Sequence, residues 1–131
     1  MTGRLLGHLI AIMLGGAIGA VSRYGVSHFV YVLMGRGFPY GTLVVNVLGS
    51  FLMGYLSVYL LAKVNLDPAL RFAILVGFLG SFTTFSTFSM DTLSLLESGF
   101  IAKAFTNIVI SVGASLTAVW LGVILARAMK F

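Results

Sequence analysis

The sequence has no cysteine, and it has very few side chains that could bind a metal ion or act as a base. The absence of cysteine excludes disulfide bonds, thiol redox chemistry and cysteine-based metal sites. Only three acidic residues and two histidines are present in 131 residues. Neither histidine, His8 or His28, has acidic neighbours at the spacing of a ligand set. We therefore expect no metal site built from side chains.

Charge of either sign is scarce, and apolar residues take its place. Charged residues make up 8% of the chain, hydrophobic residues make up 60%, and the mean hydropathy is +1.11. A soluble domain of this size could not bury so much apolar surface, because its surface-to-volume ratio is too high. Four apolar runs are long enough, at about 20 residues each, to cross a bilayer. The sequence predicts an all-α integral membrane protein with a single domain over residues 1–131.

The four expected spans cover about residues 5–31, 42–61, 69–96 and 104–127. The first run is far longer than the apolar core of a signal peptide (about 7–15 residues), and no small-x-small cleavage site ends it, so we expect no cleavable signal. Gly35, Gly37 and Pro39 mark the first connection. Asp67 and Pro68 are typical of the cap and first turn of the third helix.

The net charge of +5 comes from basic residues that are scattered singly between the spans. This distribution is typical of charges that flank membrane spans, so we expect no nucleic-acid partner. With four spans, the N-terminus, the middle loop and the C-terminus share one side. That side has five basic residues and the other has three: Arg4, Lys63, Arg71, Arg127 and Lys130 against Arg23, Arg36 and Lys103. The weak asymmetry leans toward a cytoplasmic N-terminus and permits insertion in both orientations.

Small residues repeat every four positions in the first span and predict a face for close helix contact. Ala11, Gly15 and Gly19 form this row, and Arg23 continues it, so Arg23 points toward protein rather than lipid. An arginine inside a membrane is costly and is a candidate functional residue. The alternative is an arginine near the end of a span whose side chain extends to the interface.

Amides and hydroxyls form polar faces on the second and fourth spans. Asn46 shares a helical face with Ser50 and Gly54. Because an unpaired amide is costly in hydrocarbon, Asn46 serves either to join helices or to bind a ligand. The fourth span has a polar stripe beside a row of small residues: Asn107, Ser111 and Ser115 beside Ala114, Ala118 and Gly122.

The third span contains the most unusual stretch of the chain, Gly77–Ser89. Phenylalanine recurs every third residue, and six hydroxyl side chains lie near the membrane centre. Paired glycines and adjacent threonines weaken a continuous helix, so we expect the third helix to break here. Irregular backbone at membrane depth survives only where it is buried in protein or lines a wet cavity. We therefore expect this stretch to be the functional core.

The polar groups inside the spans are amides, hydroxyls and one guanidinium. No Asp, Glu, Lys or His lies in the middle of a span, and Asp91 and Glu97 belong to the end of the third. A proton-coupled carrier needs a titratable group in its path, and an enzyme needs a nucleophile with a base or a metal. Donors without carboxylates favour an anion instead, and the edges of phenylalanine rings carry partial positive charge. Weak, multiple sites of this kind suit conduction better than capture.

Three motifs in this sequence resemble the small fluoride channels (Fluc, also called CrcB), and the resemblance covers the whole chain. They are Gly15–Ala20 followed by Arg23 and Tyr24, Gly41–Asn46 with Gly49, and Gly77–Ser89 with its Thr-Thr-Phe-Ser-Thr-Phe core. One departure is Ser81, where relatives usually have a second glycine after Gly80.

The resemblance implies an antiparallel, dual-topology homodimer in the bacterial inner membrane, with two fluoride pores at the subunit interface. It implies that fluoride passes by electrodiffusion along a set of polar and aromatic residues: Thr42, Asn46, Phe85, Phe88, Asn107, Ser111 and Ser115. Arg23 matches an arginine near the pore mouth. The backbone carbonyls of Gly80 and Thr83 match the ligands of a structural Na⁺ at the dimer centre. Phe82, in contrast, is expected to serve only packing.

Two other classes of protein remain as alternatives. A dual-topology small-molecule exporter has a similar size and charge balance, but relies on a glutamate in its first span, and residues 5–31 have none. A membrane scaffold subunit would account for the rows of glycine and alanine. It would not account for a hydroxyl-rich stretch at mid-depth.

Overall fold

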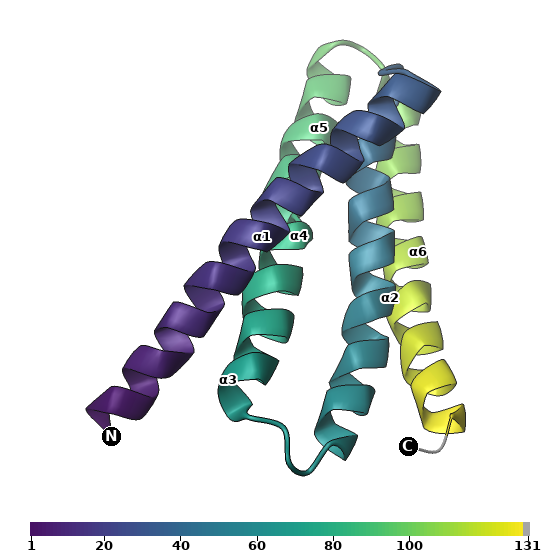
Figure 1. Ribbon diagram of the computed structural model, residues 1–131. Helices are drawn as coiled ribbons and strands as arrows, with labels where there is room; N and C mark the ends of the chain where they lie inside the picture. Colours follow the sequence, from purple (N-terminus) through teal and green to yellow (C-terminus); the bar gives the residue numbers. More distant parts are fainter. Residues whose placement is uncertain (130–131) are drawn as a thin grey trace.

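The computed structural model describes residues 1–129, and within that range the chain forms helices and no strands (Figure 1). Lys130, one of the basic residues counted above, lies outside the described residues. The helices are α1 (Thr2–Met34), α2 (Tyr40–Ala62), α3 (Pro68–Arg71), η1 (Phe72–Leu79), α4 (Gly80–Phe82), α5 (Phe85–Glu97) and α6 (Ile101–Ala128). Here α3, η1, α4 and α5 together make up the third expected span.

Four helical segments are long and apolar enough to cross a membrane. They are Thr2–Met34, Tyr40–Ala62, Pro68–Glu97 and Ile101–Ala128, each slightly longer than the sequence predicted. The first helix ends where Gly35 takes a positive φ of 80°, a conformation that a residue without a Cβ adopts most easily. The chain is a multi-pass membrane protein.

The third span changes its backbone conformation twice along its length. Residues Phe72–Leu79 form a π-helix, which is wider than an α-helix. After the short helix α4, Thr83 (φ −85°, ψ 156°) and Thr84 (φ −152°, ψ 114°) have extended backbone before α5 begins at Phe85. This extended pair lies inside the stretch that the sequence marked as unusual.

Side-chain caps stabilise the starts of two segments of this span. The Asp67 carboxylate accepts a hydrogen bond from the Ala69 N–H (2.9 Å), with Pro68 in the first turn, which confirms the predicted cap. The Thr84 hydroxyl caps α5 in the same way by accepting from the Thr87 N–H (3.2 Å). The extended pair is therefore followed directly by a helix, α5, with a normal N-terminal cap.

Glycines bring the helices together in two pairs. Gly15 and Gly19 of α1 lie directly against the backbone of η1, at the carbonyls of Ala73 and Phe78, so a Cβ at either glycine would clash. Gly54 of α2 and Gly122 of α6 lie equally close to the backbone of the facing helix. Both rows of small residues predicted from the sequence are confirmed as contact faces.

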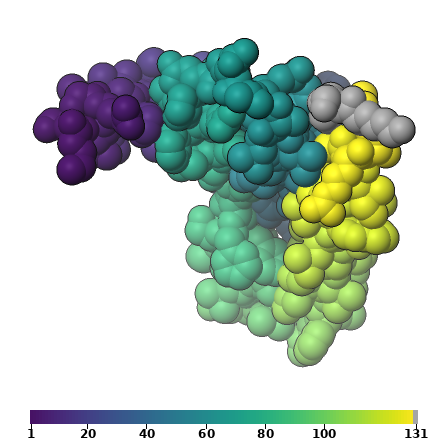
Figure 2. Space-filling view, turned by 90° about the horizontal axis from the view of Figure 1, so that it is seen from below, coloured from purple at the N-terminus to yellow at the C-terminus, as the bar shows by residue number. Residues whose placement is uncertain are grey.

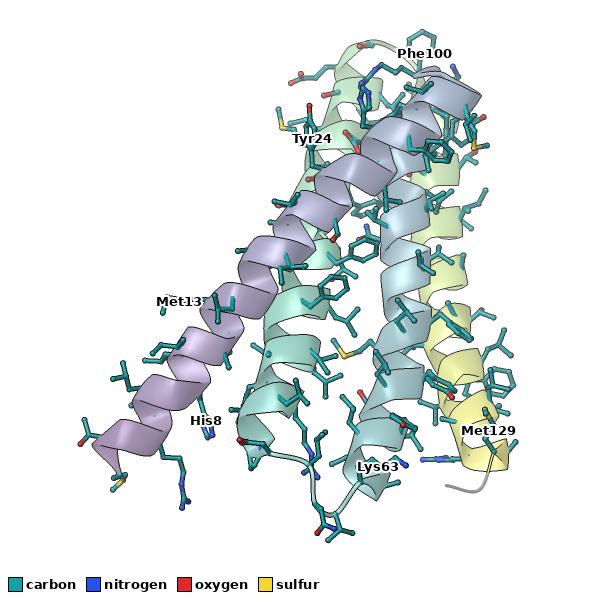
Figure 3. All side chains as sticks on the ribbon, viewed as in Figure 1. His8, Met13, Tyr24, Lys63, Phe100 and Met129 are labelled. Carbon is teal, nitrogen blue, oxygen red and sulfur yellow. The ribbon has the colours of Figure 1, made fainter. Side chains whose placement is uncertain are left out.

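The helices run between two ends of the molecule. The N-terminus, the loop after Lys63 and the last described residue, Met129, all lie at one end (Figures 1 and 3), as four crossings require. The N-terminal half of α1 stands apart from α2 and α6 (Figure 2). Large apolar side chains cover the outer faces of the helices, which fits a surface in contact with lipid.

Candidate functional site

The extended pair is held in place by one amide from α2. Asn46 Nδ2 donates to the Thr84 carbonyl (3.0 Å), and Asn46 Oδ1 accepts from the Thr84 N–H (2.7 Å). In a continuous α-helix that N–H would bond the carbonyl four residues earlier, which is Gly80. The amide therefore takes the place of a helical partner and leaves the Gly80 carbonyl without its usual donor.

The Thr84 hydroxyl likewise takes the place of a helical acceptor, the Thr83 carbonyl. It accepts from the Thr87 N–H, which in a continuous helix would bond the carbonyl of Thr83. It also lies within hydrogen-bonding distance of the Ser86 hydroxyl (3.2 Å) and donates to the Thr87 hydroxyl (3.0 Å). Two backbone carbonyls, those of Gly80 and Thr83, thus lose their helical donors at mid-span.

A cavity of about 260 Å³ opens beside the extended pair, between α2, α5 and α6; we call it the Phe cavity. No ionisable side chain is among its lining residues: Asn46, Ser50, Thr83, Thr84, Phe85, Phe88, Ser111, Val112, Ser115 and Leu116. The Phe85 and Phe88 rings lie with centroids 5.4 Å apart at 46°. The Phe85 side chain is 76% exposed, while that of Phe88 is 8% exposed, so only Phe85 could move freely.

A chain of hydrogen bonds fixes the wall behind Ser111. The Ser111 hydroxyl donates to Asn107 Oδ1 (3.0 Å), Asn107 Nδ2 donates to the Thr92 hydroxyl (2.9 Å), and Thr92 donates to the Phe88 carbonyl (2.8 Å). Asn107 is only 2% exposed and does not line the Phe cavity. Asn107 therefore holds α5 against α6 near the Phe88 ring.

Two hydroxyls in the Phe cavity are free to donate. Ser50 and Ser115 come from α2 and α6, and neither has a side-chain hydrogen bond to another described residue. Each hydroxyl carries one donor that can rotate toward a bound group. An anion in the Phe cavity would therefore meet hydroxyl donors and the rings of Phe85 and Phe88.

A neighbouring cavity of about 390 Å³ is lined by Arg23, Thr42, Thr84, Thr87 and Asp91, among others; we call it the Arg23 cavity. Thr84 lines both cavities, so the extended pair separates them. The Thr42 hydroxyl donates to Asp91 Oδ2 (2.7 Å). Asp91 lies in the last third of the span Pro68–Glu97, as expected, and the sequence did not predict its contact with Thr42 of α2.

The structure brings most of the expected site residues together, but not in one place. Five of the seven expected pathway residues line the Phe cavity: Asn46, Phe85, Phe88, Ser111 and Ser115. Thr42 and the half-buried Arg23 line the Arg23 cavity instead. Phe82 is 3% exposed and stacks on Phe78 with centroids 5.7 Å apart, which confirms its predicted packing role.

Ser50, Thr84 and Thr92 were not among the expected pathway residues. Ser50 was recognised on the helical face of Asn46 and Thr84 as part of Gly77–Ser89, but neither was assigned to the path. Thr92 lies one turn after Phe88. The role of Thr84 had no such signal, because its hydrogen bonds to Asn46 depend on two helices meeting.

The chain is similar to proteins of one known family. A family model described as CrcB-like protein, Camphor Resistance (CrcB), matches residues 10–123. A fluoride-specific ion channel FluC of Methylococcus capsulatus is 55% identical over 119 residues, which are 91% of this chain and 52% of that protein. FluC proteins of Citrifermentans bemidjiense and a strain of Coxiella burnetii are 49% and 45% identical over 121 residues, which are 92% of this chain and 98% of each relative.

This chain spans about half the length of the Methylococcus relative and nearly all of the other two. Because the family model covers most of the chain and the relatives align along its length, the chain belongs to the CrcB family.

Proposed function

We propose that this protein is a fluoride-selective channel that lets fluoride leave the cytoplasm by passive electrodiffusion across the bacterial inner membrane. The observation that carries the proposal is the Phe cavity. Hydroxyls, an amide and two aromatic rings line it, and no carboxylate or amine is among its lining residues. Such a site favours a small anion over a cation. The one carboxylate among the residues that line the neighbouring Arg23 cavity, Asp91, accepts a hydrogen bond from Thr42. The relatives named as fluoride-specific channels support the same ion.

The proposed path uses the residues that line the two cavities. Arg23 and Thr42 line the Arg23 cavity, and Asn46 lines the Phe cavity and binds Thr84, which lines both. Phe85, Phe88, Ser111 and Ser115 then form the Phe cavity, with Asn107 supporting Ser111 from behind. Each group offers a weak interaction, so fluoride could bind and leave rapidly, as conduction requires.

A second copy of the chain completes the proposed channel. The weak charge asymmetry permits both orientations, and an antiparallel pair would place the two extended segments together at the membrane centre. The exposed Phe85 ring and the open side of the Phe cavity would then face the partner. We propose two such pores for each dimer, one on either side of the two-fold axis.

The freed carbonyls of Gly80 and Thr83 fit a structural Na⁺ between the two copies. Backbone oxygens suit a hard cation, and within the described residues no cluster of acidic or histidine side chains offers an alternative site. Bound Na⁺ would neutralise the partial negative charge of these carbonyls where no water is present.

Replacing Na⁺ by a large organic cation should lower the midpoint of thermal unfolding of the purified dimer. An unchanged midpoint would exclude a structural role for Na⁺.

The alternative classes receive less support from the geometry. A multidrug-type exporter needs a membrane-embedded glutamate in its first span, and α1 has no acidic residue. A scaffold subunit would not require free hydroxyls that line a cavity at mid-span, such as those of Ser50 and Ser115. Both alternatives predict that the protein alone conducts no fluoride.

The deciding experiment is ion efflux from liposomes that contain the purified protein. We expect rapid fluoride efflux, measured with a fluoride electrode, and negligible chloride efflux from matched liposomes. The flux should follow the membrane voltage when no pH gradient is present. A strict need for a proton gradient, or equal rates for chloride, would contradict the proposal.

A further inference from the structure

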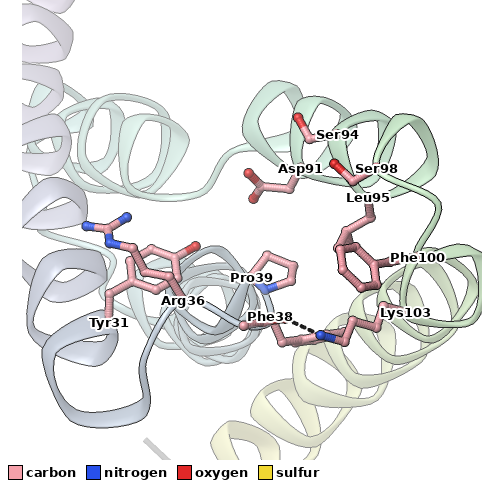
Figure 4. A pocket seen from close by; sticks show the side chains of 11 residues that line it. Tyr31, Arg36, Phe38, Pro39, Asp91, Ser94, Leu95, Ser98, Phe100 and Lys103 are labelled. Carbon is pink, nitrogen blue, oxygen red and sulfur yellow. Dashed lines mark hydrogen bonds between the residues drawn. The ribbon is translucent and has the colours of Figure 1, made fainter.

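A third cavity, of about 380 Å³, lies at the end of the molecule where α1 meets α2 and α5 meets α6. Figure 4 shows Arg36 and Lys103 on opposite sides of this cavity, with the Asp91 carboxylate on α5 across from them. Two cationic side chains therefore face one carboxylate. The polar lining distinguishes this cavity from the lipid-facing surface of the helices.

Both cations are held in place without being neutralised. The Arg36 guanidinium lies 4.6 Å from the centroid of the Tyr31 ring. Lys103 Nζ donates to the Gly37 carbonyl (2.9 Å) and lies 4.8 Å from the centroid of the Phe100 ring. These partners carry no net charge, and Asp91 is the one carboxylate among the residues that line the cavity, so two cations against one anion leave a net positive charge for a bound anion.

The cavity leads toward the proposed path. Tyr31, Arg36 and Asp91 line both this cavity and the Arg23 cavity, so the two adjoin. The Arg23 cavity in turn shares Thr84 with the Phe cavity. Three cations, Lys103, Arg36 and Arg23, thus follow one another from the end of the molecule inward, against the single carboxylate of Asp91 that lines both cavities.

We propose that Arg36 and Lys103 form an entrance vestibule that concentrates small anions before they reach Arg23. The inference rests on the proposed channel function. It assigns a role to two residues that lie outside the Phe cavity and would not bind the ion there. Walls of low dielectric around a charged cavity focus its field and raise the local concentration of counter-ions. The contacts of Arg36 with Tyr31 and of Lys103 with Gly37 hold both charges at the edge of the cavity. The two side chains therefore attract an anion without binding it tightly.

The test is fluoride conductance in planar bilayers at two ionic strengths, for Arg36→Gln, Lys103→Gln and the double variant. In water, a unit charge about 8 Å from an ion changes the local concentration about two-fold at 0.01 M salt, and hardly at all at about 1 M. We therefore expect a loss of about two-fold for each single variant and about four-fold for the double variant at low ionic strength. The variants should approach the wild type when a salt of a large organic anion is added.

Two sets of controls separate charge from structure. Arg36→Lys and Lys103→Arg keep the charge and should keep the conductance of the wild type. Lys63→Gln removes a cation that also lies over a tyrosine ring, at 5.0 Å from the Tyr59 centroid. Lys63 lies at the opposite end of the molecule (Figure 3), so this change should have no effect. A loss that is the same at both ionic strengths, or that also appears in the charge-preserving variants, would overturn the vestibule.

The phosphate of a lipid headgroup has the same chemistry as a free anion and is the competing occupant. The measurements are therefore repeated in bilayers with and without anionic lipid. Losses that appear only with anionic lipid would assign the cavity to headgroups and overturn the proposal. Wild-type conductance in the double variant would also overturn it while leaving the channel function intact. Absence of fluoride current in the wild type would refute the channel function itself.

Discussion

Asn46 combines two tasks in a single amide. Its oxygen and one of its N–H groups hold the backbone of Thr84, and the second N–H remains for the cavity that it lines. The sequence left open whether this residue joins helices or binds a ligand. The geometry supports the first role directly, and the second depends on the remaining N–H.

Asn46→Asp should abolish fluoride conduction. An ionised carboxylate would repel both the Thr84 carbonyl and an approaching anion, and losing a buried hydrogen bond costs about 1–3 kcal/mol. We expect the efflux rate from liposomes to fall by more than about ten-fold at a pH above about 8, where the carboxylate is ionised. Asn65→Asp, the same change in the exposed loop before α3, serves as the control. Normal flux in Asn46→Asp would remove this residue from the path.

Phe85→Ile should reduce conduction strongly while the protein remains folded. Isoleucine keeps apolar bulk but lacks the electropositive ring edge, an interaction of about 1 kcal/mol, so we expect a loss of about five-fold or more. Phe88→Ile should act similarly, with some loss of stability because Phe88 is buried. Phe105→Ile, a change at an exposed position on α6, is the matched control. Equal flux in all three variants would mean that the rings serve only packing.

At the scale of helices, small residues decide which faces meet. The row of Ala118 and Gly122 is buried against α2, and the row of Gly15 and Gly19 is buried against η1. Their spacing of four was readable in the sequence, but the identity of the opposing helix was not. Only the folded chain shows that α1 pairs with the π-helical half of the third span.

Gly122→Ala should destabilise the protein, although alanine is the better helix former. The added Cβ would meet the backbone of Phe51 and Tyr55 on α2, and overpacking of this kind costs about 1–3 kcal/mol. Gly113→Ala lies on the same helix with no neighbour within 4 Å, and should leave stability unchanged or raise it by up to about 1 kcal/mol. Thermal unfolding in detergent compares the two. Equal midpoints would show that α2 and α6 can separate without cost.

At the scale of the whole molecule, the single chain leaves functional groups uncovered. The Phe85 ring is largely exposed, and two mid-span carbonyls lack helical donors. Unsatisfied backbone groups are costly in lipid, so these features favour a partner at the membrane centre. We propose an inverted second copy as this partner, because the basic residues are distributed almost evenly between the two ends.

Single cysteines introduced by Thr2→Cys and Ser98→Cys should each be labelled from both sides of the membrane. Thr2 begins α1 and Ser98 follows α5, so the two positions lie at opposite ends of the molecule (Figure 1), and the sequence contains no cysteine of its own. Membrane-impermeant thiol reagents applied to intact cells and to inverted vesicles give the measurement. Labelling of each position from one side only would contradict the antiparallel dimer, together with the shared Na⁺ site and the interfacial pores.

Composition and spacing determined by themselves that this chain is a helical membrane protein with four spans. Apolar runs must lie in lipid, and small residues four apart must lie on one helical face, so neither inference needs tertiary contacts. The motifs also identified Asn46, Phe85 and Phe88 as candidates. Only the tertiary structure decided that Asn46 bonds Thr84, that Thr42 bonds Asp91 and that Asn107 lies behind Ser111. Each of these bonds joins residues on different spans or fixes a side-chain direction, and helical periodicity specifies a face but not what that face meets.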